Sequence, residues 1–211
     1  HCDVPVDAVV TLPTVSSVYE VPLIFENERL GDLINETLDL TVQDRDLADW
    51  QKLVNLIQRP KRSLPIAVVG KYVDLHDSYI SVKEALLHAG LQFDREVEVI
   101  WVGSEDVEEA GAESLLGSVS GIVVPGGFGP RGVEGMIDAV RYARDHAVPY
   151  LGLCLGLQVM VIDVARDLLG FTDANSTEFD RSTPHPVIDL MDAQKGVTDM
   201  GGTMRLGVYP C

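Results

Sequence analysis

The chain has 211 residues and a formal net charge of −17, from 16 Lys and Arg against 33 Asp and Glu. So acidic a chain is a poor candidate for binding a nucleic-acid backbone, because it has few cations to replace the counterions condensed on phosphates. Hydrophobic residues make up 46% of the sequence, which suits a packed core and excludes a disordered acidic tail. The apolar runs are too short to cross a bilayer. We expect a soluble globular protein with neither a membrane nor a nucleic-acid partner.

Cysteine usage indicates the compartment. Cys2, Cys154 and Cys211 are widely spaced and form no C-x-x-C pair, and the five histidines lack metal-ligand spacing. This pattern favours a reducing cytoplasm and no metal site. Lys is scarce, with 5 residues against 20 Asp. Such a composition could indicate a high-salt cytoplasm, where screening removes self-repulsion, but we favour an ordinary acidic enzyme.

The N-terminal residues hold too little apolar sequence for a core of their own. They begin with His1 rather than Met, and a short strand is predicted at 8–10, with a second apolar run at 18–24. We interpret residues 1–24 as the end of a larger domain.

Residues 25–63 are predicted to be a linker between domains. Apolar residues at helical spacing predict a helix over about 46–59, with Asp46 as its N-cap and Pro60 as its stop. The basic segment 59–63 is the clearest linker in the sequence.

From residue 64 onward, strand and helix patterns alternate. Strands are predicted at 66–69, 96–102, 121–124 and 149–153, and helices at about 78–90, 105–117, 133–146 and 155–169. Repeated β-α units indicate an α/β fold with a doubly wound, mostly parallel sheet. In such a sheet, functional residues gather at the carboxyl ends of the strands.

A glycine-rich turn, Pro125–Gly132, follows one predicted strand. It contains a formal G-x-G-x-x-G, typical of dinucleotide sites, but the carboxylate expected about 20 residues later is missing from 149–154. Four glycines in this turn instead indicate a backbone that approaches a ligand closely and presents N–H groups to it.

A second turn, Gly152–Gly156, reads G-L-C-L-G and matches the nucleophile-elbow pattern with Cys in place of Ser. The helix N-terminus that follows would favour a reactive thiolate at Cys154. The N–H of Leu155 would face a developing oxyanion, and Gly127 could supply a second donor. A buried structural cysteine is the alternative, and the flanking glycines favour the nucleophile.

Segments Gly152–Gln158 and Pro125–Gly135 resemble the class I glutamine amidotransferases. Further segments narrow the resemblance to the glutaminase domain of the CTP synthase family, and they are Val69–Tyr72, Asp77–Tyr79, Ala174–Phe179 and Gly201–Gly207. The resemblance covers essentially the whole chain. It implies a flavodoxin-like fold, with the end of the synthetase domain at 1–24, an interdomain linker at 25–63 and the amidotransferase domain at 64–211.

The resemblance implies that Cys154 attacks the side-chain amide of glutamine, giving a glutamyl thioester and ammonia. Gly127 and Leu155 would form the oxyanion hole, and Glu178 would pair with the α-ammonium group of glutamine. The glutamine-binding residues implied are Gly127, Leu155, Gly156, Leu157, Gln158 and Glu178.

The resemblance also implies partners for the longer enzyme. In this family a synthetase domain uses ATP, Mg²⁺ and the ammonia to convert UTP into CTP, GTP activates glutamine hydrolysis, and the enzyme is a homotetramer. No cofactor is implied for the 211 residues themselves.

The sequence departs from the family at the catalytic base. The family's His-Pro-Glu segment is absent, because His185-Pro186-Val187 has an apolar third position and follows Cys154 too soon. We interpret His185 as structural, and His76, His88 and His146 do not fit the role. The 211 residues end before the expected His and Glu, so we expect negligible glutaminase activity from them alone. A non-catalytic module kept for folding or oligomer contacts, and a different elbow-type cysteine hydrolase, are the alternatives.

Overall fold

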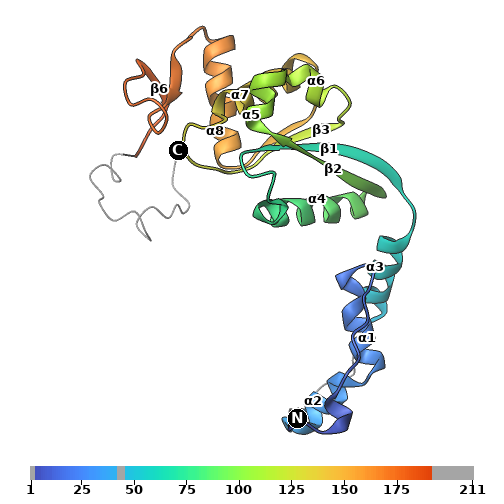
Figure 1. Cartoon of the computed structure of the whole chain (residues 1–211). Coiled ribbons are helices and arrows are strands. Elements are labelled where there is room, and N and C mark those ends of the chain that lie inside the picture. The colour runs from blue at the N-terminus through green and yellow to red at the C-terminus, as the bar shows by residue number, and fades with distance from the viewer. Residues whose placement is uncertain (1–2, 42–45, 192–211) are drawn as a thin grey trace. The chain divides into compact units, whose positions relative to one another are not determined.

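The structure is a computed structural model that describes residues 3–41 and 46–191 (Figure 1). Cys2, Cys211 and the Gly201–Gly207 segment, which entered the sequence argument, lie outside the described residues. The chain divides into two compact units. The first consists of residues 1–62 with 91–94, and the second of residues 63–90 with 95–211.

The first unit is helical, and the strand predicted at 8–10 is wrong. Its elements are η1 Val6–Ala8, η2 Val18–Glu20, α1 Val21–Asn27, α2 Leu30–Thr37 and α3 Ala48–Gln58. Ser17 and Glu20 form a capping box, because the Ser17 hydroxyl accepts from the Tyr19 N–H and the Glu20 carboxylate accepts from the Ser17 N–H. Pro22 lies in the first turn of α1, where its missing N–H costs nothing. Where the strand was predicted, the N–H groups of Ala8 and Val9 donate to the carbonyl oxygens of Pro5 and Val6, both at 3.0 Å, and form the turn η1 instead.

Helix α3 confirms the helix predicted over about 46–59. It begins two residues late, so its N-cap is Leu47 rather than the predicted Asp46, whose carboxylate still accepts a hydrogen bond from the Ala48 N–H at 2.8 Å. The indole of Trp50 donates to the Tyr19 carbonyl at 2.7 Å, which ties α3 to η2. Val54 is the buried residue of this helix, at 3% exposure.

The second unit is built on a four-stranded sheet in the order β2-β1-β3-β4. The strands are β1 Arg62–Gly70, β2 Arg95–Gly103, β3 Gly121–Val124 and β4 Tyr150–Gly152. Strand β3 pairs in parallel with β1 on one side and β4 on the other. The predicted α/β fold with a parallel sheet is confirmed. Strand β1 starts at Arg62, so the end of the predicted 59–63 linker is already strand.

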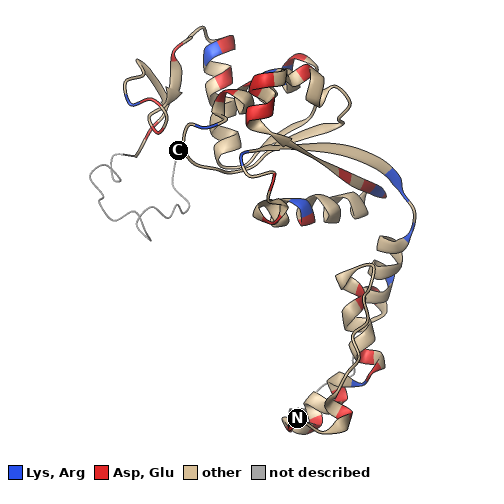
Figure 2. Ribbon diagram, in the orientation of Figure 1, with Lys and Arg blue, Asp and Glu red and all other residues tan. Residues whose placement is uncertain are grey.

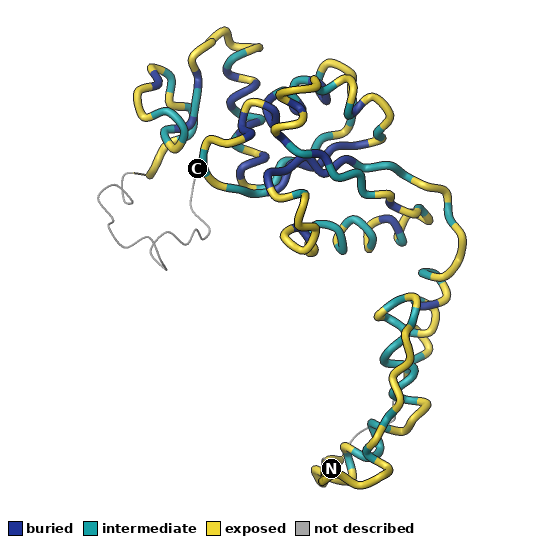
Figure 3. Tube along the Cα trace, viewed as in Figure 1, coloured by how far each residue is buried: buried dark blue, intermediate teal, exposed yellow. Residues whose placement is uncertain are grey.

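Helices cover both faces of this sheet. They are η3 His76–Tyr79, α4 Ile80–Gln92, α5 Ser104–Ala110, α6 Ala112–Leu116, α7 Val133–Asp145, α8 Leu155–Asp163 and the π-helical turn η4 Val164–Leu168. Helix α4 packs on the face that carries Val68 and Val123, and α5, α7 and α8 pack on the face of Val69 and Val124 (Figure 1). The buried residues lie along β1, β3, α7 and α8 (Figure 3).

Three predicted helix boundaries are wrong, each for a local reason. Gly90 lies inside α4 rather than ending it, and a Cβ there would come 2.8 Å from the Arg95 carbonyl oxygen. Gly111, with φ +82°, divides the helix predicted over 105–117 into α5 and α6. After Asp163 the predicted single helix widens into the π-helical turn.

A small parallel sheet, absent from the sequence predictions, follows α8. It consists of β5 Ala174–Ser176 and β6 His185–Ile188. Acidic side chains lie on helices of both units, notably α5 (Figure 2). Within the described ranges, no helix is long and apolar enough to cross a membrane.

Candidate active site

Cys154 lies between β4 and α8 in an unusual backbone conformation, with φ +53° and ψ −104°. A non-glycine residue stays in such a conformation only when its surroundings enforce it. Here the strand turns directly into the helix, and the thiol is exposed at the carboxyl end of β4.

Two glycines make this sharp turn possible. A Cβ at Gly152 would lie 2.4 Å from the carbonyl group of Gly156, and a Cβ at Gly156 would lie 2.0 Å from the carbonyl oxygen of Val124. The backbone of the turn is hydrogen bonded on both sides of the cysteine. The Leu153 N–H donates to the Val124 carbonyl at 2.9 Å, and the Leu157 N–H donates to the Cys154 carbonyl at 3.0 Å.

The structure brings the two predicted glycine turns together. An added Cβ at Gly126 would lie 3.6 Å from the Cβ of Cys154, and one at Gly127 would lie 3.3 Å from a methyl carbon of Leu155. Gly127 and Leu155, the predicted oxyanion donors, therefore come from adjacent strand ends. Leu155 is the first residue of α8, and the first N–H groups of a helix have no partner within it.

Lys71, at the carboxyl end of β1, anchors the first glycine turn. It is 6% exposed, and its ammonium group donates to the carbonyl oxygens of Phe128, at 3.1 Å, and Gly129. Burial lowers the pKa of Lys71, and the nearby carboxylate of Glu178 opposes that shift. No role for Lys71 was predicted from the sequence. The only signal there was its place directly after a run of buried strand residues.

Arg131 holds the same turn from its other end. Its guanidinium group donates to the Lys71 carbonyl at 2.9 Å, pairs with Glu105 and lies over the ring of Tyr72. The hydroxyl of Tyr79 accepts a hydrogen bond from the Lys71 N–H at 3.1 Å. Burial raises the pKa of the Tyr79 phenol, so the hydroxyl stays neutral. These contacts fix the backbone at the end of β1 against the turn after β3.

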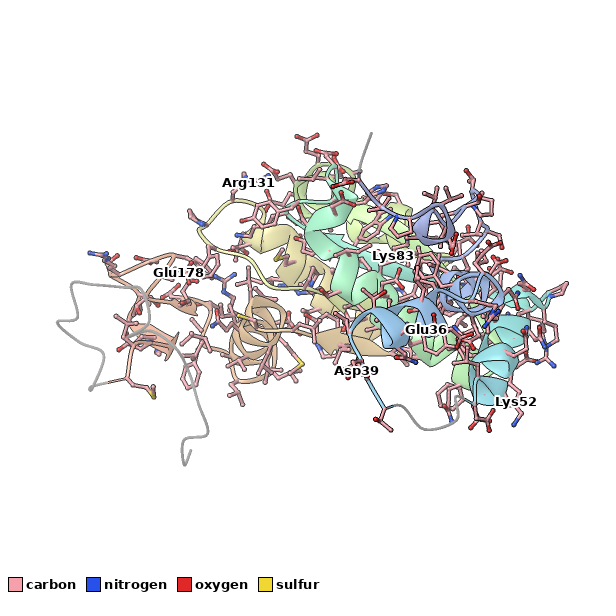
Figure 4. All side chains as sticks on the ribbon, turned by 90° about the horizontal axis from the view of Figure 1, so that it is seen from below. Glu36, Asp39, Lys52, Lys83, Arg131 and Glu178 are labelled. Carbon is pink, nitrogen blue, oxygen red and sulfur yellow. The ribbon has the colours of Figure 1, made fainter. Side chains whose placement is uncertain are left out.

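Glu178 reaches the glycine turn from the loop that follows β5. Its carboxylate accepts a hydrogen bond from the Gly129 N–H at 2.8 Å, and its own N–H donates to the Ser176 hydroxyl at 3.2 Å. Figure 4 labels Glu178 and Arg131, which come from these two separate loops. Glu178 therefore lies at the turn that also holds Gly127.

The other predicted glutamine-binding residues lie in the first turn of α8. Gly156 is buried, Leu157 is 50% exposed, and Gln158 is half-buried. The Gln158 N–H donates to the Cys154 carbonyl at 3.2 Å, so Gln158 lies one helical turn beyond Cys154. Their roles in binding stay predictions.

Three of the histidines stack on aromatic rings. His185, on β6, stacks on Phe171, with ring centroids 4.8 Å apart, and its Nδ1 is buried without a hydrogen-bond partner among the described residues. His76 stacks on Trp101, and His146 stacks on Tyr142 at the end of α7. His88 lies on α4. Among residues 3–41 and 46–191, no three or more His, Cys, Asp or Glu side chains are grouped to hold a metal ion. That His185 is structural stays a prediction.

Comparisons with known proteins place this geometry in a family. Residues 74–211 match the model of the family described as glutamine amidotransferase class-I. A CTP synthase of Roseiflexus castenholzii is 60% identical over 210 residues, which are 99% of this chain and 38% of that enzyme. A CTP synthase of Chloroflexus aurantiacus is 56% identical over 209 residues, again 99% of this chain and 38% of that enzyme.

A solved structure described as "Trypanosoma brucei CTPS - glutaminase domain with bound acivicin" is also similar. It is 39% identical, with a TM-score of 0.58, and the match covers 63% of this chain and 52% of that one.

The chain therefore belongs to the class I glutamine amidotransferase family. The narrower resemblance indicated by its motifs, to the glutaminase domain of CTP synthase, is confirmed. The chain spans 38% of the length of the two CTP synthases compared.

Proposed function

We propose that this chain is the glutamine-hydrolysing part of a CTP synthase, with Cys154 as the nucleophile of that step. The observation that carries the proposal is the backbone of Cys154, held at φ +53° at the start of α8 and against Gly126. This arrangement exposes a thiol at the start of a helix, beside N–H groups that have no partner within the helix.

In the proposed reaction the Cys154 sulfur attacks the side-chain amide carbon of glutamine, and the electron pair of the C=O bond moves to oxygen. The N–H groups of Gly127 and Leu155 donate to that oxyanion. When the tetrahedral intermediate collapses, the C–N bond breaks, and the proton lost by the thiol leaves with the nitrogen as ammonia. Water then attacks the glutamyl thioester, releasing glutamate and the thiol.

Glutamine would be held by both turns. Glu178 would pair with its α-ammonium group, and the residues Leu155, Gly156, Leu157 and Gln158 would line the elbow side. The position of Glu178 on the Gly129 N–H supports this role, because the carboxylate is fixed at the turn that holds Gly127. The acivicin bound to the Trypanosoma brucei domain would occupy the corresponding site here.

The ammonia would be consumed by a longer enzyme. In that enzyme ATP and Mg²⁺ activate UTP for amination to CTP, GTP activates glutamine hydrolysis, and a homotetramer works in the cytoplasm. Residues 1–24 would be the end of its synthetase domain and residues 25–63 the connection to the glutaminase domain at 64–211. The CTP synthases that match 99% of this chain support these assignments.

A glutamine analogue with a diazoketone in place of the amide tests the proposal. We expect it to alkylate Cys154 in preference to Cys2 and Cys211, as read by peptide mapping, and we expect free glutamine to protect Cys154. The Cys154→Ser variant should take up no label at this position. Equal labelling of all three cysteines, or labelling that glutamine leaves unchanged, would contradict the proposed nucleophile. Complete absence of labelling would favour a non-catalytic module.

A further inference from the structure

The hydroxyl of Tyr150, on β4, donates a hydrogen bond to the carbonyl oxygen of Gly156 at 2.8 Å. Gly156 belongs to the first turn of α8, two residues after Cys154. Tyr150 and Gly152 alternate to the same face of β4, and an added Cβ at Gly152 would also meet Gly156. Tyr150 therefore contacts the start of α8 from the same face of β4 as Gly152.

The Gly156 carbonyl belongs to the same peptide group as the Leu157 N–H, and that N–H donates to Cys154. The peptide unit between Gly156 and Leu157 accepts the Tyr150 hydrogen bond through its oxygen, and its N–H donates to the Cys154 carbonyl at 3.0 Å. Two hydrogen bonds in series thus connect the phenol to the carbonyl group of Cys154. That carbonyl defines ψ of Cys154, which is the strained angle of −104°. Hydrogen bonds in such a chain polarise and strengthen one another.

The ring of Tyr150 is held by the core, and a buried carboxylate acts on its hydroxyl electrostatically. Tyr150 packs against the core between the sheet, α7 and α8. Asp163, on α8, has a fully buried side chain and interacts electrostatically with Tyr150. Burial, with this carboxylate adding to it, raises the pKa of Tyr150, so the hydroxyl remains a donor throughout the physiological range. Arg144, on α7, donates to Asp163 at 3.3 Å and connects the arrangement to the neighbouring helix.

We propose that Tyr150 is a positioning residue for Cys154, whose hydroxyl holds the elbow backbone in the conformation that presents the thiol. The inference rests on the proposed function, since it concerns the reactivity of the nucleophile. Other hydrogen bonds that hold the elbow join backbone groups, such as Leu153 to Val124. The Tyr150 hydrogen bond comes from a side chain, so a single substitution can remove it without changing any residue of the elbow, 152–156.

The test is the pH profile of Cys154 alkylation by iodoacetamide in the wild-type chain and in Tyr150→Phe, followed by peptide mapping. Phenylalanine keeps the ring in the core and removes the donor. We expect alkylation at pH 7 to slow about fivefold, the size of effect that loss of one hydrogen bond gives, and the profile to move to higher pH. Tyr142→Phe is the matched control, because Tyr142 is a buried tyrosine of the same core on α7. It should leave the profile unchanged.

The outcomes separate this inference from the proposed function. If wild-type Cys154 reacts with the profile of a free cysteine, the proposed nucleophile fails. If wild-type Cys154 is activated and Tyr150→Phe matches it, or if Tyr142→Phe slows alkylation equally, only the role of Tyr150 fails.

Hydrogen exchange provides a second reading in the wild-type chain itself. The Leu157 amide should be protected, and it should exchange faster in Tyr150→Phe, whereas the Val123 amide in β3 should be unaffected. An unprotected Leu157 amide in the wild type would overturn the inference whether or not the variant folds.

Discussion

The carboxylate of Glu178 accepts a hydrogen bond from the backbone N–H of Gly129, while Lys71 donates to the carbonyl oxygen of the same glycine. Gly129 is therefore held between an anion from the loop after β5 and a cation from the end of β1. Its φ of +75° is one that glycine adopts without steric cost. The turn that carries Gly127 is thus fixed by charges from two other segments, and each charge can be removed separately.

Glu178→Gln separates the charge of Glu178 from its hydrogen bond. The amide oxygen can still accept from the Gly129 N–H, so the free energy of unfolding should change by less than about 0.5 kcal/mol. The concentration of the diazoketone analogue that gives half-maximal labelling of Cys154 should rise at least about tenfold, because an ammonium partner is lost. Glu134→Gln, which removes an exposed charge on α7 that pairs with Arg166 of η4, is the control and should label normally. Normal labelling of Glu178→Gln would contradict the assigned role.

Lys71→Met tests the buried ammonium group through the pH dependence of stability. The pKa of Lys71 is lowered by burial from the ordinary 10.5, so just below pH 10.5 the unfolded chain binds more protons than the folded chain does at this residue. The contribution of Lys71 to stability should therefore increase as the pH rises toward 10.5. Urea unfolding of wild type and variant should show a difference that grows in favour of wild type between pH 8 and pH 10.5.

Lys52 provides the comparison for this experiment. Its ammonium group is exposed and paired with Asp49 on α3. The pH trend of Lys52→Met, subtracted from that of Lys71→Met, leaves the part that is due to burial of Lys71. Equal trends for the two variants would contradict the predicted effect of burial.

Gly156→Ala should destabilise the second unit by about 3 kcal/mol, at the upper end for an inserted methyl group. The added carbon would lie 2.0 Å from the Val124 carbonyl oxygen, so either the helix or the strand must move. Gly126→Ala is the matched control, because its added carbon meets the Cβ of Cys154 at an ordinary 3.6 Å. Urea unfolding should separate the two variants clearly, and equal midpoints would contradict the close approach.

Asp163→Asn should change how the free energy of unfolding depends on pH in the acid range. Burial raises the pKa of the Asp163 carboxyl above 3.8, and Arg144 opposes that shift. Above pH 3.8 the folded chain then binds more protons at this residue than the unfolded chain does, so its contribution to stability falls as the pH rises. The free energy of unfolding of Asp163→Asn, relative to wild type, should therefore increase from pH 3.8 upward. Asp138→Asn, at an exposed partner of Arg141, is the comparison, and equal trends for the two variants would contradict the effect of burial on Asp163.

The strongest patterns in the sequence predicted the second unit well. Strand β3 matches the predicted range 121–124 because four fully buried residues in a row, closed by Pro125, leave little choice of structure. The sharp turn at Gly152–Gly156 was also predicted, since two glycines that flank a cysteine between a strand and a helix are typical of it. The first unit was predicted less well, because the apolar residues at 8–10 suggested a strand where the turn η1 ends.

The role of Lys71 was beyond the reach of the sequence. Its contact with the glycine turn depends on β1 lying next to β3, and strand order is a property of the whole sheet rather than of any segment. Gly90 was misread for the same kind of reason. A glycine near the end of a helical pattern usually marks a stop, but here it makes room for the approach of Arg95 from the following strand.

The parallel sheet has a consequence for how the chain acquires reactivity. Ile66 pairs with Gly121, and Val123 pairs with Leu151, so the two glycine turns meet only after distant segments have joined. Pairings between distant segments form late, since they must first overcome the entropy of closing long loops. The elbow on its own is a strained cysteine with no neighbour to complete its site. Enhanced reactivity of Cys154 should thus appear at the end of folding. A thiol probe applied during refolding would therefore measure the rate at which the native state forms.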